Sequence, residues 1–211
     1  MAQYSSANAS DDVDFGGNWE LDYSRSDNIQ ARLDSMVREL RQRMERAQSG
    51  NMNTRNSGGA SYGGGGAYNS GPSVIGLARM ADLVTQSQLL EIEQGTFDIK
   101  VKREENFALT CEFYGKGMQS EQTPFGNELC GWNAHQFVFE VALPEGLSIR
   151  HVFTMGPTGK RLNIATTVVS DRVSYPFTLN RVYNRYEAGS NGISCELTLT
   201  RGKVCTTEAP K

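Results

Sequence analysis

The feature that most constrains this chain is an alternation of apolar and polar residues between Gln136 and Val169. Two turn sequences, Pro144-Glu145-Gly146 and Gly156-Pro157-Thr158-Gly159, divide it into three runs. Successive side chains of a strand point to opposite faces, so a period of two indicates antiparallel strands with one buried and one wet face. The apolar positions of the three runs are Phe137, Phe139, Val141 and Leu143, then Leu147, Ile149, Phe153 and Met155, then Leu162, Ile164 and Val168.

Shorter alternations lie on both sides of this stretch and predict further strands, with a loop expected over Gly115 to Gly126 and a short strand over Glu128 to Trp132. A meander this long would leave bare edges unless it closed, so we predict a mostly β, antiparallel up-and-down β-barrel of roughly eight to ten strands. The first strand would close it beside the last. The apolar positions of these runs are Trp19, Leu21 and Tyr23; Leu90 and Ile92; Phe97, Ile99 and Val101; Phe107, Leu109, Cys111 and Phe113; and Phe177, Leu179 and Tyr183.

Two helices are predicted as an insertion over residues 28–87, directly after the first strand. Apolar residues from Ile29 to Ala47 recur at steps of three and four, which is the spacing of one helical stripe over residues 28–48. A second stripe follows Pro72-Ser73 and predicts a helix over residues 73–87. The intervening residues 49–71 are rich in Gly, Asn and Ser, a composition typical of a flexible linker.

The domain organisation follows from these patterns. Residues 1–14 lack apolar periodicity and are expected to form a flexible N-terminal arm. Residues 15–187 are expected to form one barrel domain that carries the helical insertion, and residues 188–211 a tail or hairpin.

Composition excludes several classes of protein. The net charge of −3 argues against nucleic acid as a partner, because nucleic-acid-binding domains usually carry a basic field. No run of 18 apolar residues is present, so no membrane-spanning helix is predicted.

The four cysteines allow three pairings. The pairs nearest in sequence, Cys111–Cys130 and Cys195–Cys205, are expected as disulfides, which would indicate an oxidising compartment. The alternative is four buried free thiols in a cytosolic protein.

Catalytic patterns are missing from the sequence. There is no Gly-x-Ser-x-Gly, and the run Gly63-Gly64-Gly65-Gly66 lacks the Lys-Ser or Lys-Thr of a phosphate loop. His151 has inward parity and could contact a ligand or act as an acid–base group, but a core histidine bonded to a neighbour is the simpler interpretation. With two histidines and no suitable ligand spacing, no metal site is expected. No cofactor is expected either, and because catalytic patterns are missing the protein is not expected to be an enzyme.

The first and last strands carry a pattern that resembles the lipocalin signature. Gly17-Asn18-Trp19 resembles the Gly-x-Trp of that family, whose tryptophan plugs one end of the barrel under an arginine of the final strand. Arg185 is the matching arginine, with Arg181 as second choice. The contact is also physically favourable, because a cation over an indole face is worth roughly 1–2 kcal/mol when it is removed from water.

Over residues 15–23 and 89–187 the chain more closely resembles lipocalin-like bacterial envelope proteins of uncharacterised role. The resemblance implies a periplasmic or extracellular protein after removal of a signal peptide, with the two helices as a lid over the barrel mouth. The pieces that carry it are the opening Gly-x-Trp-x-Leu-Asp with Ser26-Asp27, Leu90-Glu91-Ile92-Glu93-Gln94, Gly131-Trp132, Gly156 to Leu162 and Val182-Tyr183-Asn184-Arg185.

Inward parity gives the candidate ligand-binding residues. The aromatic rings predicted to point inward could fill an eight-strand barrel completely, or they could line an apolar cavity suited to a lipid or fatty acid. We therefore expect a binder of a small hydrophobic ligand, with a side-chain-filled structural or interaction protein of the envelope as the alternative. In either case the helices 28–48 and 73–87 could contact a membrane surface or a protein partner. The candidate ligand-binding residues are Phe107, Phe137, Phe139, His151, Phe153 and Tyr183.

Overall fold

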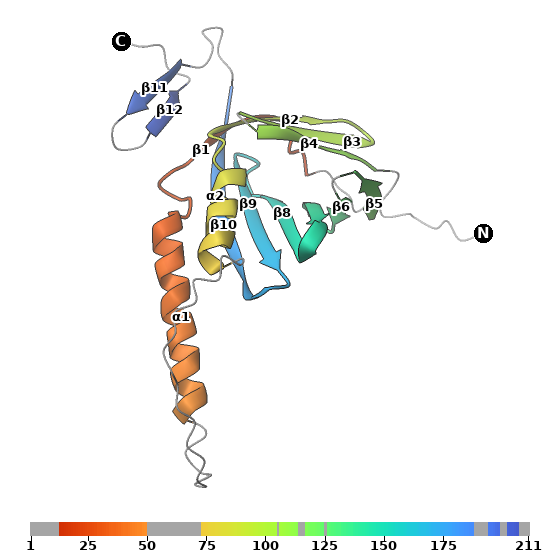
Figure 1. The fold of residues 1–211 in the computed structure, drawn as a ribbon. Helices are drawn as coiled ribbons and strands as arrows, with labels where there is room; N and C mark the ends of the chain where they lie inside the picture. Colours follow the sequence, from red (N-terminus) through yellow and green to blue (C-terminus); the bar gives the residue numbers. More distant parts are fainter. Residues whose placement is uncertain are drawn as a thin grey trace, which may run out of the picture.

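The computed structural model describes residues 13–49, 73–104, 106–113, 117–124, 126–187, 194–198 and 202–206. Ten antiparallel strands form one sheet that curls into a nearly closed barrel, as predicted, and two helices follow the first strand (Figure 1). The strands run in the order β4-β3-β2-β1-β10-β9-β8-β7-β6-β5. Their bounds are β1 Gly17–Leu21, β2 Leu89–Gln94, β3 Asp98–Arg103, β4 Asn106–Glu112, β5 Met118–Thr123, β6 Gly126–Asn133, β7 Gln136–Leu143, β8 Leu147–Met155, β9 Arg161–Ser170 and β10 Val173–Tyr186.

The short strand β1 joins the two halves of the sheet. It pairs with β10 on one side, where Trp19 lies opposite Arg185, and with β2 on the other, where Trp19 lies opposite Leu90. This confirms the prediction that the first strand lies beside the last. A 3-10 turn at Pro144–Gly146 joins β7 to β8, and a separate hairpin is formed by β11 Ser194–Thr198 and β12 Gly202–Thr206.

The helices α1 (Ile29–Ser49) and α2 (Val74–Val84) begin at side-chain caps. The Asn28 side chain accepts a hydrogen bond from the Ala31 amide at 3.1 Å, and the Ser73 hydroxyl accepts one from the Gly76 amide at 3.1 Å. Such caps satisfy amides that have no partner within the helix. The Gly-rich residues 50–71 lie outside the described part of the chain.

Helix α2 covers one end of the barrel. Its buried residues Leu77, Ala78 and Ala81 pack against the inward side chains of β9 and β10 in a core cluster separate from the main one. Helix α1 lies against α2 and adds Met36 to this cluster, then extends past the barrel (Figure 1). The other members of the cluster are Val168, Phe177 and Leu179.

The barrel is open between β4 and β5, which are the two edges of the sheet although they are neighbours in sequence. The expected loop over Gly115 to Gly126 is wrong, because its described residues include strand β5, which pairs with β6 along its whole length. At Gly131 the backbone of β6 approaches the backbone of Gly117 closely. The φ of Gly131 is +142°, and a Cβ at this residue would lie 2.1 Å from the Gly117 carbonyl oxygen. We call the gap between β4 and the β5–β7 side of the sheet the seam.

Three aromatic residues do not follow the expected inward orientation. Phe97 is 58% exposed, Phe107 is 94% exposed, and Tyr23, which lies beyond the end of β1, is 43% exposed. Phe97 lies just before β3 begins, and Phe107 lies near the start of the edge strand β4, next to a register shift between β3 and β4. Parity alone predicts the face of a strand, but a side chain is buried only where another element lies opposite.

Candidate functional site

The end of the barrel remote from α2 is filled by aromatic rings. Phe137 contacts Phe139 with ring centroids 5.2 Å apart and Trp132 at 5.1 Å, while Phe15 stacks on Trp132 at 5.7 Å. Phe15, Trp19 and Phe137 are fully buried. Edge-to-face pairs at these distances are favourable beyond their burial, so this end is a solid core.

The predicted contact between Trp19 and Arg185 is present. The Arg185 guanidinium carbon lies 4.5 Å from the Trp19 ring centroid. The guanidinium also donates to the backbone oxygens of Asp14, Gly16 and Gly159, which ties the chain before β1 to the turn between β8 and β9. Gly17, with φ +119°, keeps the backbone close to this guanidinium.

Arg181, the second-choice arginine, has a different contact. Its guanidinium donates to an Asp82 carboxylate oxygen at 3.0 Å and to the Asp27 backbone oxygen at 2.9 Å. Asp82 lies on α2 and Arg181 on β10, so the pair fixes the helix on the end of the barrel.

The middle of the barrel holds a small polar pocket of about 20 Å³. His151 Nδ1 lies 2.8 Å from the Thr166 hydroxyl, and the Tyr183 hydroxyl donates to the Ser87 backbone oxygen at 3.0 Å. Burial lowers the pKa of His151 to about 3, helped by the positive charge of Arg103, so the imidazole is neutral at pH 7. Burial raises the pKa of Tyr183. This space holds about one water molecule and no larger ligand.

A larger hollow of about 460 Å³ opens at the seam, between β4 on one side and β6 and β7 on the other. We call it the seam cleft. This volume lies in the range of about 300–1,000 Å³ typical of small-molecule sites. Its apolar lining is Phe107, Ala108, Leu109, Leu129, Phe139 and Val141, together with the Cys130 sulfur, and its polar lining is Arg103, Thr110, Glu128 and Glu140.

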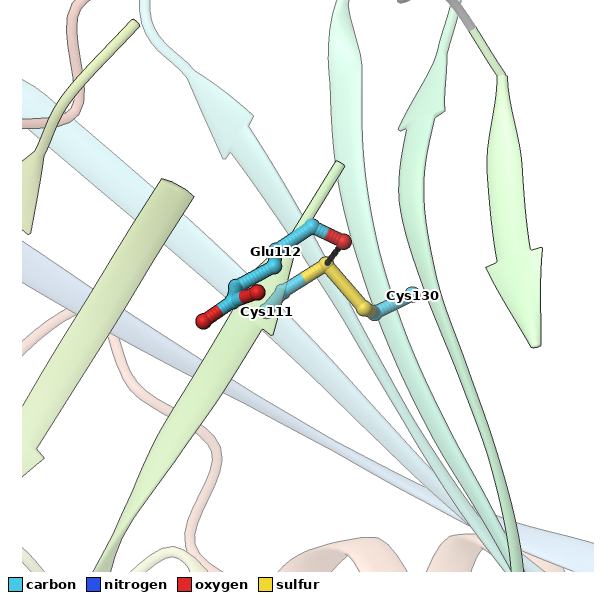
Figure 2. The surroundings of a disulfide bond; sticks show 3 residues. All are labelled: Cys111, Glu112 and Cys130. Atoms are coloured by element: carbon cyan, nitrogen blue, oxygen red, sulfur yellow. Dashed lines mark hydrogen bonds between the residues drawn. A yellow bond between two sulfur atoms is a disulfide. The ribbon is translucent and has the colours of Figure 1, made fainter. Parts of the chain in front are cut away.

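The Cys111–Cys130 disulfide crosses the seam at one end of this cleft, and it confirms one of the two predicted pairs. Figure 2 shows the bridge running from β4 to β6, with a Cα–Cα distance of 6.0 Å. Beyond the disulfide a second hollow of about 440 Å³ is lined by the carboxylates of Glu112, Glu121 and Glu128. Glu128 and Cys130 line both hollows, so the two hollows meet at the disulfide.

The second predicted disulfide is Cys195–Cys205, and the structure does not describe the side chains of these two residues. The backbone register of the β11–β12 hairpin sets Cys195 opposite Cys205. This placement leaves the Cys195–Cys205 pair as a prediction.

The six candidate ligand-binding residues lie in three different places. Phe107 and Phe139 line the seam cleft. His151, Phe153 and Tyr183 line the small polar pocket. Phe137 is buried among the aromatic rings and lines neither space.

Sequence reasoning missed Arg103, which lines both the seam cleft and the small polar pocket. Its Nε and Nη2 donate to the Phe107 backbone oxygen, and its Nη1 donates to the Val84 backbone oxygen at 3.2 Å. In the sequence it follows Lys102 and precedes Glu104 and Glu105, so it reads as one charge of a solvated run. No signal in the sequence marks it.

No family model and no curated protein matches the sequence. Within the described residues, no group of three or more His, Cys, Asp or Glu side chains is arranged to hold a metal ion. Neither described helix has the length and apolar character needed to cross a bilayer.

Proposed function

We propose that the protein binds a small hydrophobic molecule in the seam cleft. The observation that carries this is the cleft itself, an apolar hollow of about 460 Å³, set beside a barrel interior that leaves only about 20 Å³ in its polar pocket. The two candidate residues on its wall differ in exposure, because Phe139 is 5% exposed and Phe107 is 94% exposed. A fully exposed phenylalanine at the rim of an apolar hollow gains burial when a ligand enters.

The protein acts as a binding protein rather than an enzyme, and it works in an oxidising compartment, periplasmic or extracellular. The Cys111–Cys130 disulfide supports this compartment, since such bonds persist mainly in oxidising surroundings.

The experiment that tests the binding site uses Nile red, a neutral hydrophobic dye, titrated into the full chain. Ala108→Trp places an indole at an exposed position that lines the cleft and should weaken dye binding at least tenfold. Ala142→Trp is the matched control, because Ala142 is exposed on β7 and does not line the cleft. Equal dye binding by both variants and the parent would reject the seam cleft as the site.

Organic extraction of the purified protein followed by mass spectrometry gives a second readout. A hydrophobic compound recovered from the parent chain and reduced in Ala108→Trp supports the proposal. A clean extract together with unchanged dye binding in Ala108→Trp counts against it.

A structural or interaction protein is the second candidate, and the filled interior favours it. Either the Gly-rich tract 49–71 or the two helices would then make the contacts. The helices offer exposed Arg38, Arg41 and Arg43 on α1 and exposed Ile75 and Leu83 on α2. Replacing residues 49–71 by a short Gly-Ser linker should then abolish association of the full chain with itself or with envelope partners in light scattering and co-purification. Unchanged association after that replacement would remove this role for the tract.

A further inference from the structure

Arg103 lies at one end of the seam cleft as a half-buried cation without a carboxylate partner among the described residues. Its three donating nitrogens reach only the neutral backbone oxygens of Phe107 and Val84. A guanidinium has five N–H donors, so these three hydrogen bonds leave two N–H groups. Partial removal of a cation from water is unfavourable unless an anion compensates it.

Two carboxylates line the walls of the cleft. Glu128 on β6 lies opposite Val141, and Glu140 on β7 lies opposite Leu129. Glu140 lies 3.8 Å from Arg150 and Glu128 lies near the Thr123 hydroxyl, so both carboxylates already have partners. An anionic group is therefore attracted to the Arg103 end, where the described residues supply no carboxylate partner.

Apolar side chains from three strands form the rest of the wall. Leu109 lies on β4, Leu129 on β6, and Phe139 and Val141 on β7. From Phe107 to Thr110 the strand advances by three residues, or about 10 Å at the rise of an antiparallel strand. The cleft therefore has the length of a medium alkyl chain, with a positive charge at one end.

We propose that the seam cleft binds a single-chain amphiphile with an anionic headgroup, such as a free fatty acid. The headgroup accepts hydrogen bonds from the two remaining Arg103 N–H groups. The alkyl chain of the ligand lies along Leu109, Leu129, Phe139 and Val141. This assignment rests on the proposed function and adds the chemical class and the orientation of the ligand.

The test compares three ligands with the same ten-carbon chain, each below its micelle concentration, as competitors of Nile red on the full chain. We expect decanoate to compete about tenfold or more better than decanol, because hydrogen bonds to a charged group are the strong ones. Decylammonium should compete less well than decanol. Decanoate and decanol of equal strength would overturn the headgroup assignment while leaving the hydrophobic site intact, and failure of all three would count against the site itself.

Arg103→Gln gives the matched variant, since glutamine keeps an amide donor for the Phe107 or Val84 oxygen and removes the charge. The preference for decanoate over decanol should fall to within about twofold, with decanol binding retained. Arg79→Gln, at an exposed position of α2 that does not line the cleft, makes the same change in net charge and should keep the preference. A preference unchanged in Arg103→Gln would overturn the role of Arg103. Should that variant not fold, the three-ligand comparison on the parent chain decides the headgroup assignment by itself.

Discussion

The Cys111–Cys130 disulfide is expected to supply much of the stability of the seam. Strands β4 and β5 end the sheet on either side, and no ladder of backbone hydrogen bonds joins β4 to β5 or β6 in the described part of the chain. The bridge therefore does covalently what strand pairing does elsewhere in the barrel. The perturbation is the double variant Cys111→Ala with Cys130→Ala.

The magnitude follows from the length of the closed loop. The two cysteines are 19 residues apart in sequence. In the chain-entropy model a cross-link over such a loop removes about 11 cal/mol/K from the unfolded state, which is about 3 kcal/mol at 25 °C. The free energy of unfolding should fall by this amount, and its dependence on urea should become steeper because the uncross-linked chain exposes more surface.

Urea unfolding of the full chain under oxidising conditions, followed by tryptophan fluorescence, measures both quantities. Cys130→Ala alone is the control, because it removes the cross-link and keeps the Cys111 sulfur, so it should reproduce most of the loss. Variants are preferable to a reducing agent, which would also act on Cys195 and Cys205 if they pair. A loss below about 1 kcal/mol with an unchanged urea slope would show that packing holds the seam, and the entropic reasoning would be wrong.

Three further predictions concern the described core. Between pH 6.5 and 5 the unfolded state protonates His151, whereas the native state does so only near its pKa of about 3. The free energy of unfolding should therefore fall with falling pH by about 1 kcal/mol per unit more than in His151→Gln; equal slopes in urea unfolding between pH 5 and 6.5 would contradict a neutral buried imidazole. Arg185→Met should lower the free energy of unfolding by about 2 kcal/mol, since it removes the contact with Trp19 and three hydrogen bonds. Arg161→Met, at another exposed position, is the control, and an equal loss of unfolding free energy in the two variants would contradict this. Gly131→Ala should lower the melting temperature far more than Gly159→Ala, because both glycines have positive φ but only at Gly131 would a Cβ meet a backbone oxygen, at 2.1 Å; similar losses in thermal melts would contradict it.

The strands from Gln136 to Ser170 could be predicted because apolar and polar residues alternate along them and turn residues separate them. Glu145, with φ +65°, and Gly146, with φ +71°, lie in the left-handed region that the turn between β7 and β8 requires. The Trp19–Arg185 contact was predictable too, because parity and barrel closure set the two residues opposite each other. Local pattern and global fold agree in this region.

Strand β5 could not be predicted, because its sequence Met-Gln-Ser-Glu-Gln-Thr has no apolar face. Its pairing with β6 along its whole length and the close approach of Gly117 to Gly131 hold this strand in place. Hydrophobic periodicity in the sequence predicts neither of these contacts. The position of the seam was unpredictable for the same reason, since it depends on which partner β5 takes.

The candidate site was only half predictable for a related physical reason. Parity identified Phe139 and Phe107, but it could not tell a ring packed in the core, such as Phe137, from one on the wall of a cleft. Arg103 was missed because much of its surroundings comes from other elements: Val84 ends α2, and the far wall of the cleft belongs to β6 and β7. A charge in a solvated run and a charge at a cleft look alike until the fold is known.

The filled interior and the open seam are consequences of the same packing. Aromatic rings occupy one end of the lumen and α2 the other, which leaves space for about one water molecule near His151. In the described part of the chain the disulfide joins β4 to β6 without a backbone ladder, and the wall beside that bond keeps a hollow of about 460 Å³. In a barrel whose centre is packed, a site in the wall is reached without moving the core. Binding at the seam would therefore bear on the edge strand β4 and leave the contacts around Trp19 unchanged.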